Sequence, residues 1–130
     1  MGKTFDDKTL ERLADLICGD KLAEKYCNNN YSNCPYYRKG SELTELFKRA
    51  GLKCQDFANE SRKGWVLKHL KIYNRTTFIN CIIFRLANPI EYDDKQSTEI
   101  ILKELNRILA FEGFTVELDN TEPKLIINDA

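Results

Sequence analysis

The segment from Ser61 to Arg75 contains the residues of this chain that are best suited to bind an anion. It has no acidic residue, and it carries the chain's single Trp and single His together with five cations: Arg62, Lys63, Lys68, Lys71 and Arg75. If Ser61 begins a helix, free backbone N–H groups and the positive end of the helix dipole reinforce those charges. The segment therefore predicts a site for a phosphate-bearing ligand or for an acidic partner surface.

We assign six residues to this predicted ligand-binding site: Ser61, Arg62, Lys63, Trp65, Lys68 and His69. Arg62 is the strongest candidate, because a planar guanidinium can hold a phosphate or a carboxylate through two bonds. A structural alternative stays open for the same residues. In that alternative Trp65 and His69 belong to the core, and Arg62 is a clamp paired with Glu60 or with an acid of residues 91–122.

A second cluster of aromatic and basic residues precedes this segment. Three tyrosines lie close to two cations, at positions Tyr31, Tyr36, Tyr37, Arg38 and Lys39. Aromatic rings interleaved with cations can stack on nucleic-acid bases. A nucleic-acid ligand is therefore an alternative interpretation for this cluster. The Asn- and Pro-rich residues around it predict that it lies in a loop.

Catalytic and metal sites are not expected. Six residues separate Cys27 from Cys34, no Cys-x-x-Cys pair occurs, and one His cannot complete a usual zinc set, so we predict no metal and no cofactor. Asp93 and Asp94 fall in a predicted loop. An enzyme with an unrecognised Cys–His pair remains an alternative to the non-catalytic interpretation.

Composition indicates one ordinary globular domain. The chain has 130 residues, 42% of them hydrophobic, and equal numbers of basic and acidic residues, so global charge favours neither DNA nor an anionic membrane. Basic residues outnumber acidic ones over residues 21–80, and acidic residues outnumber basic ones over residues 81–130. No 18-residue apolar run and no signal pattern occur, and the five cysteines suit a reducing compartment, so a cytoplasmic location without membrane contact is expected.

Hydrophobic periodicity predicts an α+β fold, mostly helical, with a C-terminal β-hairpin. Helices are expected over residues 7–18, 41–50, 61–74, 78–86 and 97–111, with a short continuation at 22–26 and a polar loop over 27–40. Alternating apolar residues at 114–118 and a return at 125–127, joined by a loop at 119–123, predict the hairpin. Because the hairpin follows a helix, a winged-helix-like arrangement is an alternative interpretation of the same pattern.

Particular residues are expected to cap the helices or to fill the core. Ser41 and Ser61 are predicted N-caps, Asn74 a left-handed helix end, and Thr76 or Thr77 the cap of the next helix. The predicted core consists of Leu13, Leu46, Phe47, Val66, Leu70, Ile79, Ile82, Ile83, Leu105, Ile108, Leu109 and Val116.

Three short patterns in this order resemble a known family. They are Gly40-x-x-Leu43-x-x-Leu46-Phe47-x-x-x-Gly51, then Ser61-Arg62-x-x-Trp65 with Leu70 and Asn74, then Leu105-Asn106-x-x-Leu109-x-x-Glu112-Gly113-Phe114. Their order and spacing resemble the AbiJ-type N-terminal domains of bacterial abortive-infection proteins, which act in antiphage defence. The resemblance covers about residues 40–118. The chain departs from the family in its many cysteines and asparagines, and residues 1–39 add little.

The resemblance implies a non-catalytic sensor or regulatory domain that controls an attached effector domain, C-terminal in the full-length protein. It assigns residues 40–130 to the AbiJ-type core and leaves 1–39 as an N-terminal helix and polar loop of the same globular unit. It supplies no catalytic motif. The implied ligand is a protein partner or a phosphate-bearing molecule such as a nucleotide, and self-association is compatible with this role. A nucleic-acid-binding module is the alternative from a different class.

Overall fold

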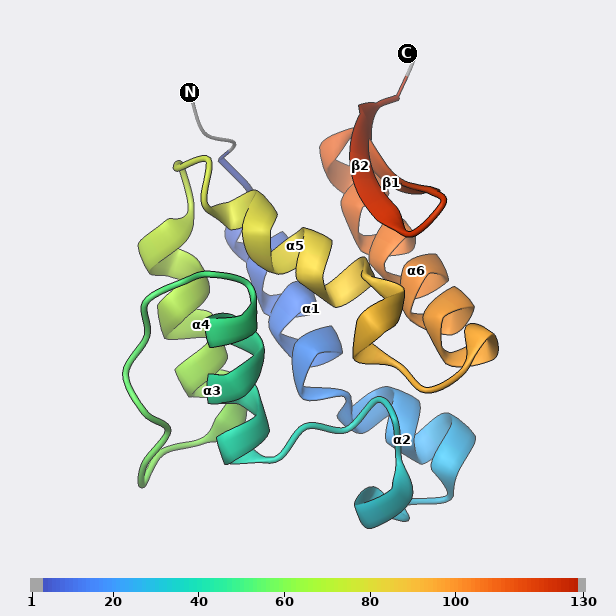
Figure 1. Ribbon diagram of the computed structural model, residues 1–130. Coiled ribbons are helices and arrows are strands. Elements are labelled where there is room, and N and C mark those ends of the chain that lie inside the picture. The colour runs from blue at the N-terminus through green and yellow to red at the C-terminus, as the bar shows by residue number, and fades with distance from the viewer. Residues whose placement is uncertain (1–3, 129–130) are drawn as a thin grey trace.

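Six α-helices and a C-terminal β-hairpin make up the part of the chain that the computed structural model describes, residues 4–128 (Figure 1). The helices are α1 (Asp7–Cys18), α2 (Asp20–Cys27), α3 (Gly40–Arg49), α4 (Arg62–Tyr73), α5 (Ile79–Ala87) and α6 (Lys95–Leu109). Short 3₁₀ turns are η1 (Tyr31–Asn33), η2 (Pro89–Glu91) and η3 (Ala110–Glu112), and the strands are β1 (Phe114–Asp119) and β2 (Glu122–Ile127). The predicted α+β, mostly helical fold is confirmed.

Helix α1 lies in the middle of the molecule, with α4 packed on one side and α6 on the other (Figure 1). Its apolar stripe, at helical spacing, is buried: Leu10, Leu13, Leu16 and Ile17. The Asp6 side chain caps the helix by accepting from the Lys8 N–H at 2.9 Å. Gly19 ends it with φ of 80°, and a Cβ there would lie 1.8 Å from the Tyr36 carbonyl oxygen. Only glycine therefore lets the 34–38 segment cross directly over the α1–α2 junction.

The core is the one that periodicity predicts, with one exception. Eleven of the twelve predicted residues are buried, and they bring α1, α3, α4, α5, α6 and β1 into a single cluster. Ile108 differs, because it is only half-buried and faces a surface groove described below.

The hairpin docks on α6 through a side chain. β1 and β2 are antiparallel, in register from Phe114 opposite Ile127 to Asp119 opposite Glu122. Asn106 on α6 donates to the Val116 carbonyl at 3.0 Å and accepts from the Val116 N–H at 2.7 Å, so its amide satisfies the strand backbone that β2 does not pair. The connection is shorter than the predicted 119–123 loop, because Pro123 lies opposite Leu118 within β2.

Two predicted caps of the earlier helices are wrong for local reasons. Helix α3 begins at Gly40, one residue before Ser41, because the Glu42 carboxylate accepts from the Lys39 N–H at 3.0 Å. Asn74 is extended rather than left-handed, since its amide is held by the Phe5 backbone at 2.9 and 3.0 Å.

The two later helices also differ from prediction at their starts. Helix α5 begins at Ile79 after an uncapped Phe78, because the Thr76 hydroxyl donates to the Tyr73 carbonyl at 2.6 Å and accepts from the Phe78 N–H, one residue before the helix. Helix α6 begins at Lys95, two residues before the predicted start, because Asp94 caps it. Among residues 4–128, no helix combines the length and the apolar character that crossing a membrane requires.

Candidate functional site

The start of α4, where the anion site was predicted, has the expected local geometry. Ser61 is the N-cap, and its hydroxyl accepts from the Gly64 N–H at 3.0 Å. A cavity of about 310 Å³ lies beside it, lined by Asp15, Cys18, Asp20, Lys21, Ser61, Arg62 and Lys63. Two carboxylates from α1 and α2 therefore share this cavity with the predicted cations.

Arg62 is held by the chain itself. Its Nε donates to the Arg38 carbonyl at 2.9 Å, and its Nη2 donates to the Cys18 carbonyl at 2.8 Å. Nη2 also lies 2.9 Å from a carboxylate oxygen of Asp20, and the guanidinium stacks 4.1 Å from the centre of the Tyr37 ring. These contacts support the structural-clamp alternative. The paired acid is Asp20, neither Glu60 nor an acid of residues 91–122, because the α1–α2 junction lies beside the start of α4.

The two lysines of the predicted site also have carboxylate partners. Lys63 pairs with Asp15 at 3.0 Å, and Lys68 pairs with Glu60 at 3.2 Å. Three of the five cations of this segment, those nearest the predicted site, are thus paired with carboxylates in the fold. The charge that an incoming phosphate would meet here is accordingly small.

Trp65 and His69 do not line a ligand contact, so that part of the prediction is wrong. Trp65 is fully buried and His69 is 2% exposed. The Phe47 ring of α3 packs edge-on against Trp65 at 5.3 Å between ring centres, and the two α4 rings lie 4.1 Å apart. The apolar face of α3 covers this side of α4, and both side chains join the core.

His69 has no ring nitrogen free for catalysis. Its Nε2 accepts from the Gln55 N–H at 3.2 Å, which places the ring proton on Nδ1, 2.8 Å from the Trp65 carbonyl oxygen. Burial raises the pKa of the Cys18 thiol to about 11. Desolvation, with contact to the Cys34 thiol, raises the pKa of Cys27 to about 11 as well. Thiols with such pKa values are poor nucleophiles near neutral pH.

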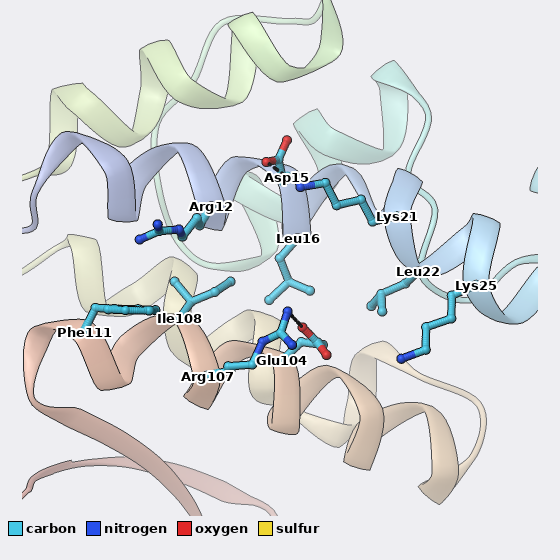
Figure 2. A pocket seen from close by; sticks show the side chains of 10 residues that line it. All are labelled: Arg12, Asp15, Leu16, Lys21, Leu22, Lys25, Glu104, Arg107, Ile108 and Phe111. Carbon is cyan, nitrogen blue, oxygen red and sulfur yellow. Dashed lines mark ion pairs between the residues drawn. The ribbon is translucent and has the colours of Figure 1, made fainter.

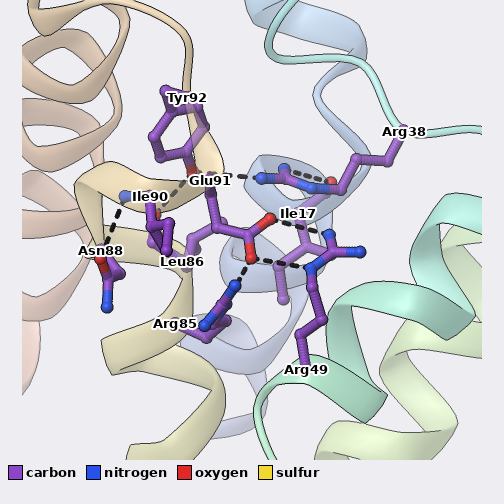
Figure 3. Close-up of polar contacts among 9 residues, drawn as sticks. All are labelled: Ile17, Arg38, Arg49, Arg85, Leu86, Asn88, Ile90, Glu91 and Tyr92. Carbon is purple, nitrogen blue, oxygen red and sulfur yellow. Dashed lines mark hydrogen bonds and ion pairs between the residues drawn. The ribbon is translucent and has the colours of Figure 1, made fainter.

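The second aromatic–basic cluster is mostly part of the packed structure, and of its five residues only Tyr31 and Lys39 are exposed. Arg38 and Tyr36 are buried, and the Tyr31 and Tyr37 rings lie against each other at 4.4 Å. Arg38 donates to the Ile17 carbonyl and to the Tyr92 hydroxyl, both at 3.1 Å (Figure 3). The cluster therefore fastens the 31–39 segment to α1 and to the chain beyond η2.

A buried carboxylate that sequence reasoning missed lies next to Arg38 (Figure 3). Glu91, with a side chain 4% exposed, accepts two bonds from Arg49 at 2.8 and 2.9 Å and a third from Arg85. Burial raises the pKa of Glu91, but the two guanidiniums outweigh it and hold the pKa below its usual range. This network ties α3 to α5 and η2. Its only sequence signal was an acid within a predicted loop.

An open groove between α1, α2 and α6 was not predicted (Figure 2). Its volume is about 450 Å³, and it is lined by Arg12, Asp15, Leu16, Lys21, Leu22, Lys25, Glu104, Arg107, Ile108 and Phe111. The apolar members come from all three helices and from η3. The groove has no signal in the sequence, because its residues belong to two segments about 80 positions apart that only the fold brings together.

Cations outnumber acids around the groove. Its two carboxylates are already paired, Glu104 with Arg107 at 3.2 Å and Asp15 with lysines of α2 and α4. Within residues 4–128, Arg12 and Lys25 form no ion pair, and each instead lies over an aromatic ring, Arg12 at 4.7 Å from the centre of Phe111. The groove thus combines an apolar lining with positive charge that the chain does not neutralise.

Comparison with protein families, with curated proteins and with solved structures finds no match for this chain. In the described part of the chain, no group of three or more His, Cys, Asp or Glu side chains is placed to hold a metal ion. The groove is therefore the candidate functional site on its own geometry.

Proposed function

We propose that this chain is a non-catalytic sensor or regulatory domain that binds a protein partner through the groove between α1, α2 and α6. One observation carries the proposal. The groove holds unneutralised cations beside exposed apolar surface, with Phe111 72% exposed. Exposed apolar patches with polar rims mark interaction sites in soluble domains.

The state of the predicted anion site supports a protein partner over a phosphate-bearing ligand. The cations of α4 there are occupied by Asp15, Asp20 and Glu60, and a phosphate would have to displace these carboxylates. The non-catalytic assignment is supported by His69, whose two ring nitrogens are both used by backbone groups.

The cellular role rests on the resemblance to AbiJ-type domains. In this proposal the domain acts in the cytoplasm of a bacterium and controls an effector in response to phage infection. Occupation of the groove is the event that the effector senses. Because α1 and α2 form two sides of the groove, residues 1–39 contribute to this role together with the 40–130 core.

A phage-protection assay on the native gene tests this proposal. Phe111→Asp places a charge on the groove, and Ile90→Asp is a matched control, since both side chains are 72% exposed and Ile90 lies in η2, away from the groove. Equal melting temperatures of the two purified variants establish equal folding. We expect Phe111→Asp to abolish protection and Ile90→Asp to retain it. Full protection by both variants would refute the proposal.

A further inference from the structure

We infer that the occupant of the groove is an acidic amphipathic α-helix of the partner protein, an inference that rests on the proposed function. The shape of the groove is the first argument. Its lining residues form one helical stripe on α1 (12, 15 and 16) and one on α6 that continues into η3 (104, 107, 108 and 111). α1 and α6 pack against each other, and Figure 2 shows Leu16 and Ile108 directed into the space between them.

Helix α2 completes the site from a third side. Lys21, Leu22 and Lys25 reach the groove from it, so the cavity is bounded by three helices and open on the fourth side. A further helix laid against such a face completes a four-helix arrangement, which is a recurrent way to bind a helical segment. An extended strand would find no open sheet edge here, because the hairpin docks on α6 through Asn106 instead.

The apolar surface defines one face of the occupant. Leu16 and Leu22 are nearly buried at the base of the groove, Ile108 is half-buried, and Phe111 is largely exposed. A helix with apolar residues at positions i, i+3, i+4 and i+7 presents a stripe that covers these four side chains. The exposed Phe111 ring is the anchor that such a partner buries.

The charges define the flanks of that face. Arg12, beside Phe111, lies toward one end of the groove and Lys25 toward the other (Figure 2). Acidic residues on both sides of the partner's apolar stripe pair with these cations. A single phosphate cannot reach two cations at opposite ends of the groove, and a nucleic-acid backbone has no stripe of apolar side chains to cover the apolar lining between them. Spaced carboxylates on a helix fit this pattern better than either phosphate ligand.

Three synthetic peptides of about five helical turns, roughly 18 residues each, test the inference on the full chain. The first has a Leu stripe flanked by Glu, the second has the same stripe flanked by Lys, and the third is the scrambled sequence of the first. Affinity is measured by fluorescence anisotropy, and the contacts by amide shifts of the isotope-labelled chain. We expect the acidic helix to bind at least about tenfold more tightly than the other two. Shifts should be confined to α1, α2 and α6.

Substitutions locate the binding. Phe111→Asp and Lys25→Glu should each weaken the acidic peptide by about tenfold, whereas Ile90→Asp should leave its affinity unchanged. Lys25→Glu should also reduce the ratio of the affinity for the acidic peptide to the affinity for the basic peptide. A Lys25→Glu variant that keeps the full preference would show that the rim charge does not select the partner.

Other outcomes overturn the inference. The inference is wrong if all three peptides bind equally or if the acidic helix does not bind. It is also wrong if inorganic phosphate or single-stranded RNA shifts the groove amides in preference to the peptide. The two proposals fail separately. If Phe111→Asp removes phage protection but the acidic peptide does not bind, the helical occupant is wrong and the proposed function stands. If the peptide binds but Phe111→Asp still protects, the proposed function is wrong.

Discussion

Replacement of Arg62 by alanine distinguishes a structural clamp from a ligand-binding arginine. The side chain is 20% exposed, and its guanidinium joins the Cys18 and Arg38 carbonyls and the Asp20 carboxylate. It thereby connects the end of α1, the start of α2 and the segment before α3 to the first turn of α4. Alanine removes all these bonds at once and also the stacking on Tyr37.

The expected cost follows from the contacts. A hydrogen bond from a charged donor to a part-buried carbonyl contributes about 1.5–3 kcal/mol. In the variant the Cys18 carbonyl still accepts from the Arg38 N–H at 3.1 Å, so losing the Arg62 bond does not leave this carbonyl unpaired. The Asp20 side chain is 60% exposed, so that ion pair adds less than about 1 kcal/mol. We therefore expect Arg62→Ala to lower the free energy of unfolding by about 3 kcal/mol, and the melting temperature by about 10 °C for a domain of this length.

Thermal unfolding followed by circular dichroism measures this effect. Lys63→Ala is the control, because Lys63 is the neighbouring cation and makes only a surface ion pair with Asp15. Its loss should change stability by less than about 1 kcal/mol. Arg62→Lys should fall between the two, since the single nitrogen of lysine cannot occupy the positions of both Nε and Nη2, which bond the two carbonyls. A melting temperature of Arg62→Ala within about 2 °C of the wild type, together with lost binding of inorganic phosphate, would refute the clamp and restore the ligand site.

Two further substitutions test the core and the buried polar network. Glu91→Gln leaves Arg49 and Arg85 without their carboxylate and should lower the free energy of unfolding by about 2–3 kcal/mol. This loss is smaller than for a fully buried ion pair, because the Arg49 side chain is 42% exposed. The folded pKa of Glu91 is lowered, so its contribution is fully present above the unfolded pKa of about 4.3 and is lost as pH falls through the folded value. Melting temperatures from neutral to acidic pH should show this loss in the wild type and a smaller one in Glu91→Gln; parallel curves would contradict it. Leu105→Ala, at a fully buried position, should cost about 2–5 kcal/mol in urea unfolding, and an unchanged midpoint would remove Leu105 from the core.

The sequence by itself determined the elements whose signals are local. Helix α1 has the predicted bounds of 7–18, because a capping Asp, an apolar stripe and a terminal glycine all lie within it. Ser61 was likewise recognisable as a cap from its neighbours alone. The observed starts of α3, α5 and α6 each differ from the predicted ones by one or two residues, since neighbouring polar residues compete to cap α3 and α6 and no side chain caps α5.

Only the tertiary structure decided which groups pair with the cations of α4 and whether its aromatic side chains are buried. The basic segment of α4 looked like an anion site because it contains no acidic residue of its own, yet Asp15 and Asp20 meet it from α1 and α2. Trp65 and His69 lie on the side of α4 that α3 covers, a contact that helical period alone does not reveal. The groove depends on the packing of α1 against α6, which the chain forms across about 80 residues. Electrostatic and apolar contacts act through space, so a charge or a surface cannot be assigned from sequence neighbours when its partners come from distant segments.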